Sequence, residues 1–403
     1  MLIFLLLVIL VYPSSTILFP PDSIDPRSFF VVVALIIIFE SLWKKDKSFG
    51  GLHHQLLIIL IFLSEIFLIV KYLIDFQELY IFRNIIIGFI LLAMVTRGEK
   101  FIQNKIFQLI SFLSVVVLFS NAVLFIYLSN YDINSIEFSV INLRYLNHLN
   151  PAITRTDFTY IIPWYLTTIP VGYLEDFFLG LSYQRYSNIF SEWTYLWYYV
   201  CPILIIRSQK KSIINLLCII QIVIILILGL SVWGLGSLIL SYVIAYIAKL
   251  INSYKLLILV FIFSAPLFFF ELFDVDAIKI LLDGIGSYRF EQVNYYLGGF
   301  NLSEITLFGS VTPPDSFEIL WGVNYILWQY GMGGFGLLIL LQIYATCIAI
   351  KILCRPDVFS NQDRSLSTTL IFLTLMGSKT PIFFPFLQIL IASVLSRKLY
   401  LKK

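Results

Sequence analysis

Residues 189–250 read IFSEWTYLWYYVCPILIIRSQKKSIINLLCIIQIVIILILGLSVWGLGSLILSYVIAYIAKL, and this stretch decides the fold class. It contains three apolar runs, at 189–206, 213–231 and 234–250. A helix that crosses the hydrocarbon core of a bilayer needs about 17–25 mostly apolar residues. The stretch therefore predicts three membrane-spanning helices, with a basic connection at Arg207, Lys210 and Lys211 between the first two.

The whole chain has the same character. Of its 403 residues, 60% are hydrophobic and 13% are charged, whereas soluble domains carry about 25% charged residues. This composition excludes a water-soluble globule, a disordered chain and a disulfide scaffold. The four cysteines lie in or beside apolar runs without metal-site spacing, so we interpret them as buried small hydrophobes; they are Cys201, Cys218, Cys347 and Cys354.

Twelve apolar runs are long enough to be candidate spans. We therefore predict an all-α polytopic membrane protein with about 12 transmembrane helices, in which residues 1–403 form a single integral membrane domain. The predicted spans are 1–19, 28–43, 55–74, 80–96, 106–129, 189–206, 213–231, 234–250, 256–273, 323–350, 366–380 and 382–396.

Basic residues set the expected orientation. With both termini in the cytoplasm, 18 of the 27 lysines and arginines fall in inner loops, as the positive-inside rule requires. Residues 130–188 and 274–322 then form two large external loops. Within the first, Phe158–Leu181 is nearly apolar but broken by prolines, and we expect it either to dip into the outer leaflet or to form an amphipathic helix on it.

The short motifs have ordinary structural interpretations. Gly331, Gly333 and Gly336 spell G-x-G-x-x-G at the head of a span, where close helix packing explains them better than nucleotide binding. Asp274 and Asp276 form a D-x-D that could hold a divalent ion, but solvated loop charges are the favoured interpretation. We predict no metal site.

External basic residues are the stronger functional signal, because positive charge outside runs against the orientation rule. Each either pairs with an external carboxylate or binds an anion such as phosphate. Glu192 and Trp193, at the start of the sixth span, are further candidates, the first for acid–base chemistry or a helix–helix hydrogen bond. An interfacial aromatic belt, whose rings could also stack on sugars, is predicted for the cluster Trp193, Tyr195, Trp197, Tyr198 and Tyr199. The external basic set is Arg27, Lys71, Arg83, Arg144, Arg155, Arg185, Lys279, Arg289 and Lys379.

One region resembles a known family. It reads Ser287-Tyr-Arg-Phe-Glu-Gln-Val-Asn-Tyr-Tyr-Leu, then Leu307-Phe-Gly-Ser, then Asp315, then Asn324-Tyr-Ile-Leu-Trp-Gln-Tyr-Gly. An external arginine, a Phe-Gly, an acidic residue and an Asn-Tyr-x-Leu entering a span resemble the core of the O-antigen polymerase and ligase superfamily. Val323 precedes Asn324 where ligases usually carry histidine, so the resemblance is closer to the Wzy-type polymerases.

The resemblance implies a GT-C-like membrane glycosyltransferase without a cofactor. Its substrates would be undecaprenyl-diphosphate-linked glycans, and its setting the lipid bilayer of the bacterial inner (plasma) membrane. A chain-length regulator protein is the implied protein partner, and no nucleic acid is involved. Many members carry an arginine between the seventh and eighth spans, where this chain has Ser231-Val-Trp-Gly-Leu-Gly. That role either falls to another external cation or is absent.

The implied site combines charge neutralisation with a base. Arg289 would grip the leaving diphosphate, and Asp315 or Glu192 would take the proton of the attacking sugar hydroxyl, with Glu291, Glu318 and Asp157 left open as bases. Substrate contacts are predicted for Arg155, Arg144, Tyr288, Asn324, Lys379 and Trp193. The competing interpretations are a lipid-linked oligosaccharide flippase or other transporter, an O-antigen ligase, and a structural membrane scaffold.

Overall fold

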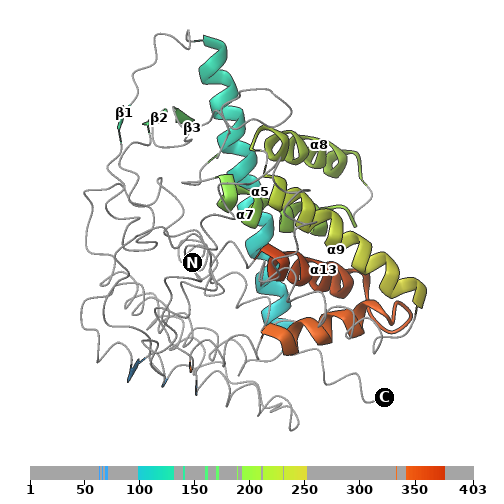
Figure 1. Cartoon of the computed structure of the whole chain (residues 1–403). Coiled ribbons are helices and arrows are strands. Elements are labelled where there is room, and N and C mark those ends of the chain that lie inside the picture. Colours follow the sequence, from blue (N-terminus) through green and yellow to red (C-terminus); the bar gives the residue numbers. More distant parts are fainter. Residues whose placement is uncertain are drawn as a thin grey trace, which may run out of the picture.

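The structure is a computed structural model of the whole chain (Figure 1). It describes residues 63, 66, 69–70, 99–130, 139–140, 159–161, 169–171, 188, 193–209, 212–229, 231–251, 333 and 342–376.

Helices make up nearly all of this part. They are α5 (Glu99–Asn130), α7 (Trp193–Arg207), α8 (Ile213–Leu228), α9 (Val232–Ile251), α13 (Asn361–Met376) and an unlabelled helix at Gln342–Leu353. The predicted helical character of these six segments is confirmed. α5 begins seven residues earlier than the predicted span at 106–129, and α13 begins five residues before the predicted 366–380.

Length separates α5 from the other described helices. It is the one helix in the described ranges that is long and apolar enough to cross a membrane, through Ile106–Val123. α7, α8, α9 and the helix at 342–353 carry apolar stretches of 10–17 residues. The total of twelve spans and the inside–outside assignment stay predictions.

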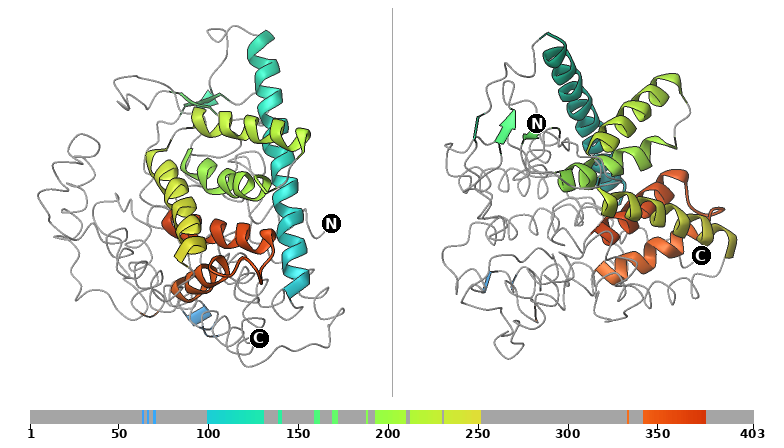
Figure 2. Two further views of the ribbon diagram at one scale, coloured as in Figure 1. Left: turned by 90° about the vertical axis from the view of Figure 1, so that its right-hand side faces the viewer. Right: turned by 45° about the horizontal axis from the view of Figure 1, so that its top comes forward.

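The helices form a packed group with α7 and α13 in its interior. In the left view of Figure 2, α5 runs along one edge, α9 lies on the opposite edge, and α8, α7, α13 and the helix at 342–353 are stacked between them. α13 packs against α9 and α7, and α7 also contacts α8, α5 and α9. α5 runs crosswise to α8 and α13 in both figures, so these helices do not form the near-parallel bundle expected of simple spans.

α5 is apolar around its circumference but is buried along one stripe. Ile106, Leu109, Ile110, Leu113 and Val117 are all at most 2% exposed, at the i, i+3, i+4, i+7 spacing of one helix face. Other apolar residues of the helix are open, among them Val115, Phe119 and Ile126 at 60–61% exposure.

α13 is buried although nine of its 16 residues carry polar side chains. Its start is fixed by a reciprocal cap, in which Ser360 N–H and Oγ donate to Asp363 Oδ2 at 3.0 and 2.6 Å, and Asp363 N–H donates to Ser360 Oγ at 3.3 Å. Further along, Thr368, Thr369 and Thr374 each donate to the carbonyl four residues earlier, at 2.8–2.9 Å. These internal bonds satisfy the threonine hydroxyls and let the helix enter the core.

α7 is held against its neighbours by Trp197. The indole Nε1–H donates to the carbonyl of Gly229, at the end of α8, over 2.6 Å. The ring also fills the space beside Gly234 of α9, where an added Cβ would lie 2.4 Å from Trp197 Cδ2. Trp197, Tyr198 and Tyr199 are 0–2% exposed. The predicted interfacial belt is therefore wrong for these three aromatics, because α7 is covered by helices on several sides.

Three short strands lie within the predicted external loop at 130–188. β1 (Ser139–Val140), β2 (Thr159–Ile161) and β3 (Ile169–Val171) form an antiparallel sheet in the order β1-β2-β3. Tyr160 pairs with Ser139 and with Pro170. The amphipathic-helix alternative is wrong for β2 and β3, since β-branched residues favour strands and proline is tolerated on an edge strand such as β3.

Candidate functional site

The residues predicted from the family resemblance are not brought together in the described part of the chain. Trp193 is the first residue of α7. The other predicted site residues lie outside the described residues; they are Arg289, Asp315, Glu192, Arg155, Arg144, Tyr288, Asn324 and Lys379. The D-x-D at Asp274 and Asp276 lies outside them as well.

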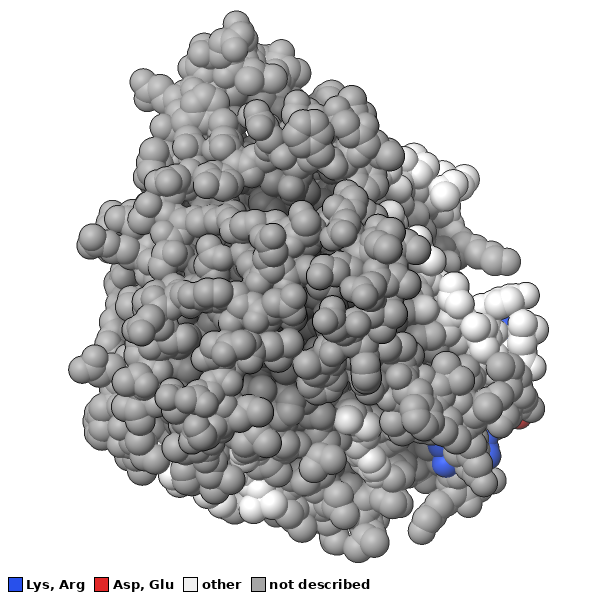
Figure 3. All heavy atoms as spheres, in the orientation of Figure 1, with Lys and Arg blue, Asp and Glu red and all other residues white. Residues whose placement is uncertain are grey.

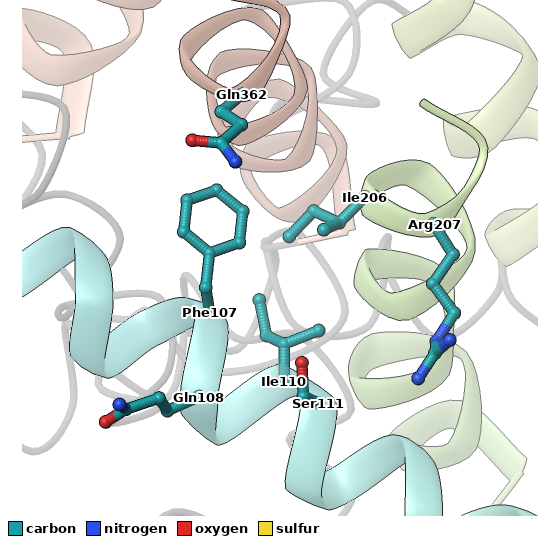
Figure 4. A pocket seen from close by; sticks show the side chains of 7 residues that line it. All are labelled: Phe107, Gln108, Ile110, Ser111, Ile206, Arg207 and Gln362. Atoms are coloured by element: carbon teal, nitrogen blue, oxygen red, sulfur yellow. The ribbon is translucent and has the colours of Figure 1, made fainter. Parts of the chain in front are cut away.

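A cavity of about 260 Å³ does lie within the described residues, between α5, α7 and α13. Figure 4 shows its lining side chains, which come from one stretch of each helix. They are Phe107, Gln108, Ile110 and Ser111 of α5, Ile206 and Arg207 of α7, and Gln362 of α13.

The lining is apolar at its centre and polar at its margin. Ile110 and Ile206 point toward each other, and the amide of Gln362 reaches toward the ring of Phe107 (Figure 4). Among the residues that the structure describes, the lining includes one cation, Arg207, and no carboxylate. The cavity can therefore receive a group that combines negative charge with an apolar portion.

Arg207 is held in place by the turn between α7 and α8. Its Nη1 donates to Asn215 Oδ1 at 3.3 Å, and Asn215 Nδ2 donates back to the Arg207 carbonyl at 2.7 Å. The Asn215 backbone N–H is bound by Ser212 Oγ at 3.2 Å, which caps α8. The arginine thus keeps further N–H donors available for a ligand.

The three helix segments at the cavity lie next to loops that the distribution of basic residues assigns to the same side of the membrane. The predicted inner loops include residues 97–105, just before the cavity-lining turn of α5, the basic turn after α7, and the turn before α13. The structure brings residues next to these loops to one cavity. This arrangement is expected if the three loops lie on the same, inner side of the membrane.

A second polar feature lies between α13 and the helix at 342–353. Thr346 Oγ1 lies 3.2 Å from Thr374 Oγ1, and it also bonds the Gln342 carbonyl at 2.8 Å. The Gln342 side chain is 3% exposed, and its Nε2 and Oε1 have no hydrogen-bond partner among the described residues. A buried amide without such partners can accept a hydrogen bond from another molecule through Oε1 and donate one to it through Nε2.

Thiols and metal ligands add little to either feature. All four cysteines are free; Cys201 and Cys354 are buried, as predicted, while Cys218 and Cys347 are only half-buried. Burial raises the pKa of the Cys354 thiol, which lies in the turn after the helix at 342–353. Within the described ranges, no three His, Cys, Asp or Glu side chains are grouped so that they could hold a metal ion.

Sequence reasoning missed both features. In the sequence, Arg207 contributes only to the predicted orientation. The cavity beside it depends on packing between residues as far apart along the chain as Phe107, Arg207 and Gln362. Gln342 is a polar residue inside an apolar run, and this is the signal that could have drawn attention to it, because polar side chains in such runs are costly unless they have a role.

In comparisons with known proteins, the chain matches no family model, no curated protein and no solved structure. The family resemblance therefore depends on the motifs between Ser287 and Gly336 and on the predicted topology.

Proposed function

We propose that this chain is a membrane-embedded glycosyltransferase of the Wzy type. It would polymerise undecaprenyl-diphosphate-linked oligosaccharide repeat units into O antigen or a similar surface polysaccharide. The reaction would take place on the outer face of the bacterial plasma membrane, with both termini of the multi-pass chain in the cytoplasm. The observation that carries the proposal is the ordered set of motifs from Arg289 through Asp315 to Asn324.

The proposed reaction needs no nucleotide and no resident metal. A hydroxyl of the acceptor repeat unit attacks the anomeric carbon of the donor glycan, the bond to the diphosphate breaks, and lipid diphosphate leaves. Asp315 or Glu192 takes the hydroxyl proton. Arg289 balances the charge that grows on the leaving diphosphate, with Arg155, Arg144 and Lys379 as further phosphate contacts. Tyr288, Asn324 and Trp193 would bind sugar.

The described helices support the membrane part of the proposal. α8 exposes apolar side chains such as Ile213, Leu217 and Ile227 at 58–80%. The described atoms visible at the upper right of Figure 3, where α8 lies, belong to neither Lys, Arg, Asp nor Glu. Contiguous exposed apolar surface of this kind is rare on soluble monomers. In a bilayer, these side chains would contact the hydrocarbon chains of lipids.

The direct test is elongation by the purified full-length chain. The protein is reconstituted in liposomes with an undecaprenyl-diphosphate-linked repeat unit, and polymer length is followed on gels. The proposal predicts a ladder of products. Movement of the unsubstituted repeat unit across the liposome membrane without elongation would instead identify a flippase.

Arg289 gives the proposal a sharper test. Charge-assisted hydrogen bonds contribute about 1.5–3 kcal/mol each, so Arg289→Ala should slow elongation by about 10- to 10³-fold. Arg289→Lys should stay slow, because an ammonium cannot bind two phosphate oxygens as a planar guanidinium does. The matched control is Arg355→Ala, which removes the same charge from the turn before α13 and should leave the ladder unchanged. A normal ladder from Arg289→Ala would remove Arg289 from the site.

A further inference from the structure

The cavity between α5, α7 and α13 lies at a boundary between polar and apolar surface. Ser208 and Gln209, which follow Arg207, are exposed polar residues. Ile213 and Ile214, at the start of α8, are exposed at 80% and 77%. Arg207 thus stands between a polar turn and the beginning of an apolar surface, which is the position of a membrane interface.

The lining matches an amphipathic anion. Arg207 has one side-chain hydrogen bond, to Asn215, so other donors of its guanidinium lack a partner among the described residues. Ser111 and Gln362 add neutral hydrogen-bonding groups, while Phe107, Ile110 and Ile206 supply apolar contact. The described lining residues include no carboxylate that would oppose a negative ligand.

We propose that this cavity binds the phosphate headgroup of an anionic membrane phospholipid. The phosphate contacts the guanidinium of Arg207, and the glycerol and upper acyl carbons lie against Phe107 and Ile206. A free phosphate ion would use the same arginine but would leave the apolar lining unfilled. The occupant is therefore a lipid, as expected for basic pockets between membrane helices on the cytoplasmic side.

This inference depends on the membrane setting of the proposed function but not on glycosyl transfer. A lipid site on the inner side would be distinct from the external residues assigned to catalysis. Its failure can be recognised separately, because lipid binding is measured on the purified chain without any glycan substrate.

The experiment is native mass spectrometry of the full-length chain in detergent, titrated with phosphatidylglycerol or phosphatidylcholine of the same acyl chains. The wild type should retain phosphatidylglycerol in preference to phosphatidylcholine. Arg207→Gln should bind phosphatidylglycerol about tenfold more weakly, the effect of losing one charge-assisted contact. The control Arg355→Gln removes an equal charge outside the cavity and should bind like the wild type.

A second variant tests the cavity without changing charge. Ser111 is exposed and lines the cavity, so Ser111→Trp should fill it and weaken phosphatidylglycerol binding as well. Ser111→Trp also tests the lipid site by itself if Arg207→Gln cannot be purified. Equal losses for Arg207→Gln and Arg355→Gln, unchanged binding by Ser111→Trp, no preference over phosphatidylcholine, or full displacement by an equal concentration of inorganic phosphate would each overturn the proposal.

Discussion

α8 and α13 have the same length and opposite relations between composition and burial. In α8, Asn215 and Gln221 are the only residues with hydrogen-bonding side chains apart from the Cys218 thiol, yet only four of its 16 residues are buried. In α13, nine of 16 side chains are polar, yet 13 residues are buried. The more apolar helix is open, and the more polar helix forms the interior.

Water would favour the reverse arrangement, since apolar side chains are the ones most often buried in soluble proteins. In hydrocarbon, lipid tails are as apolar as leucine, and helices associate through small side chains and interhelical hydrogen bonds. α13 supplies small side chains in Ser367 and Thr369, and an interhelical contact in Thr374, whose Oγ1 lies 3.2 Å from Thr346 Oγ1. All three α13 residues are at most 2% exposed. The interior at α13 thus combines an interhelical polar contact with close packing, and we propose that the exposed face of α8 contacts lipid.

The largest expected effect is a matched pair of leucine truncations. Leu373 of α13 is 0% exposed and Leu217 of α8 is 58% exposed. Leu373→Ala should lower the free energy of unfolding by about 2–5 kcal/mol, because it opens a cavity in packed surroundings. Leu217→Ala should change it by less than about 0.5 kcal/mol. Reversible unfolding in detergent measures both changes. Equal losses of unfolding free energy for the two variants would contradict the difference in burial between the two helices.

Close packing predicts a second, smaller difference between two glycines of α9. An added Cβ at Gly234 would clash with Trp197, whereas one at Gly236 would meet nothing within 4 Å. Gly234→Ala should destabilise by about 1–3 kcal/mol through overpacking. Gly236→Ala should stabilise by up to about 1 kcal/mol, because alanine is the better helix former. The melting temperatures of the two variants should move in opposite directions; a shift of both in the same direction would contradict the packing described for Trp197.

The smallest effect concerns polar contacts. Thr374→Val keeps the shape of the side chain but removes its 3.2 Å contact with Thr346 Oγ1. A loss of about 0.6–1.7 kcal/mol is expected, the range for hydrogen bonds between membrane helices. Thr374→Ser, which keeps the hydroxyl, should lose less of the contact energy. Gln221→Leu on the exposed face of α8 should be neutral or stabilising, and destabilisation by this change would show that α8 faces water.

Sequence periodicity and length predicted the described helices well, because apolar runs bounded by basic turns such as 207–211 mark helices regardless of how they pack. Burial was harder to predict. Trp197, Tyr198 and Tyr199 have a composition typical of the interface, and only contacts with α8, α9 and α13 put them inside. The strands of the first external loop were missed because short β-branched segments interrupted by proline also fit irregular membrane-surface structure.

The two candidate sites differ in the same way, because one could be predicted from the sequence and the other depends on packing between helices. The proposed phosphate-binding role of Arg289 comes from charge placement and family-like motifs, which can be recognised in the sequence alone. The cavity at Arg207 requires Phe107, Ile206 and Gln362 to meet, and no local pattern links residues so far apart. The Gln342 amide, which has no hydrogen-bond partner among the described residues, likewise becomes informative only when its burial beside Thr346 is known.

The central claim is that the exposed face of α8 contacts hydrocarbon, and site-directed spin labelling tests it most directly. A nitroxide is attached at Ile224→Cys, which is 47% exposed in the native chain, with the four native cysteines replaced by alanine and the protein in liposomes. A second label at Asp357→Cys, in the exposed turn before α13, is the aqueous reference. Oxygen concentrates in lipid and a neutral nickel chelate in water, so the label at position 224 should collide mainly with oxygen and the label at 357 mainly with nickel. Nickel collisions at position 224 as frequent as those at 357 would contradict the account.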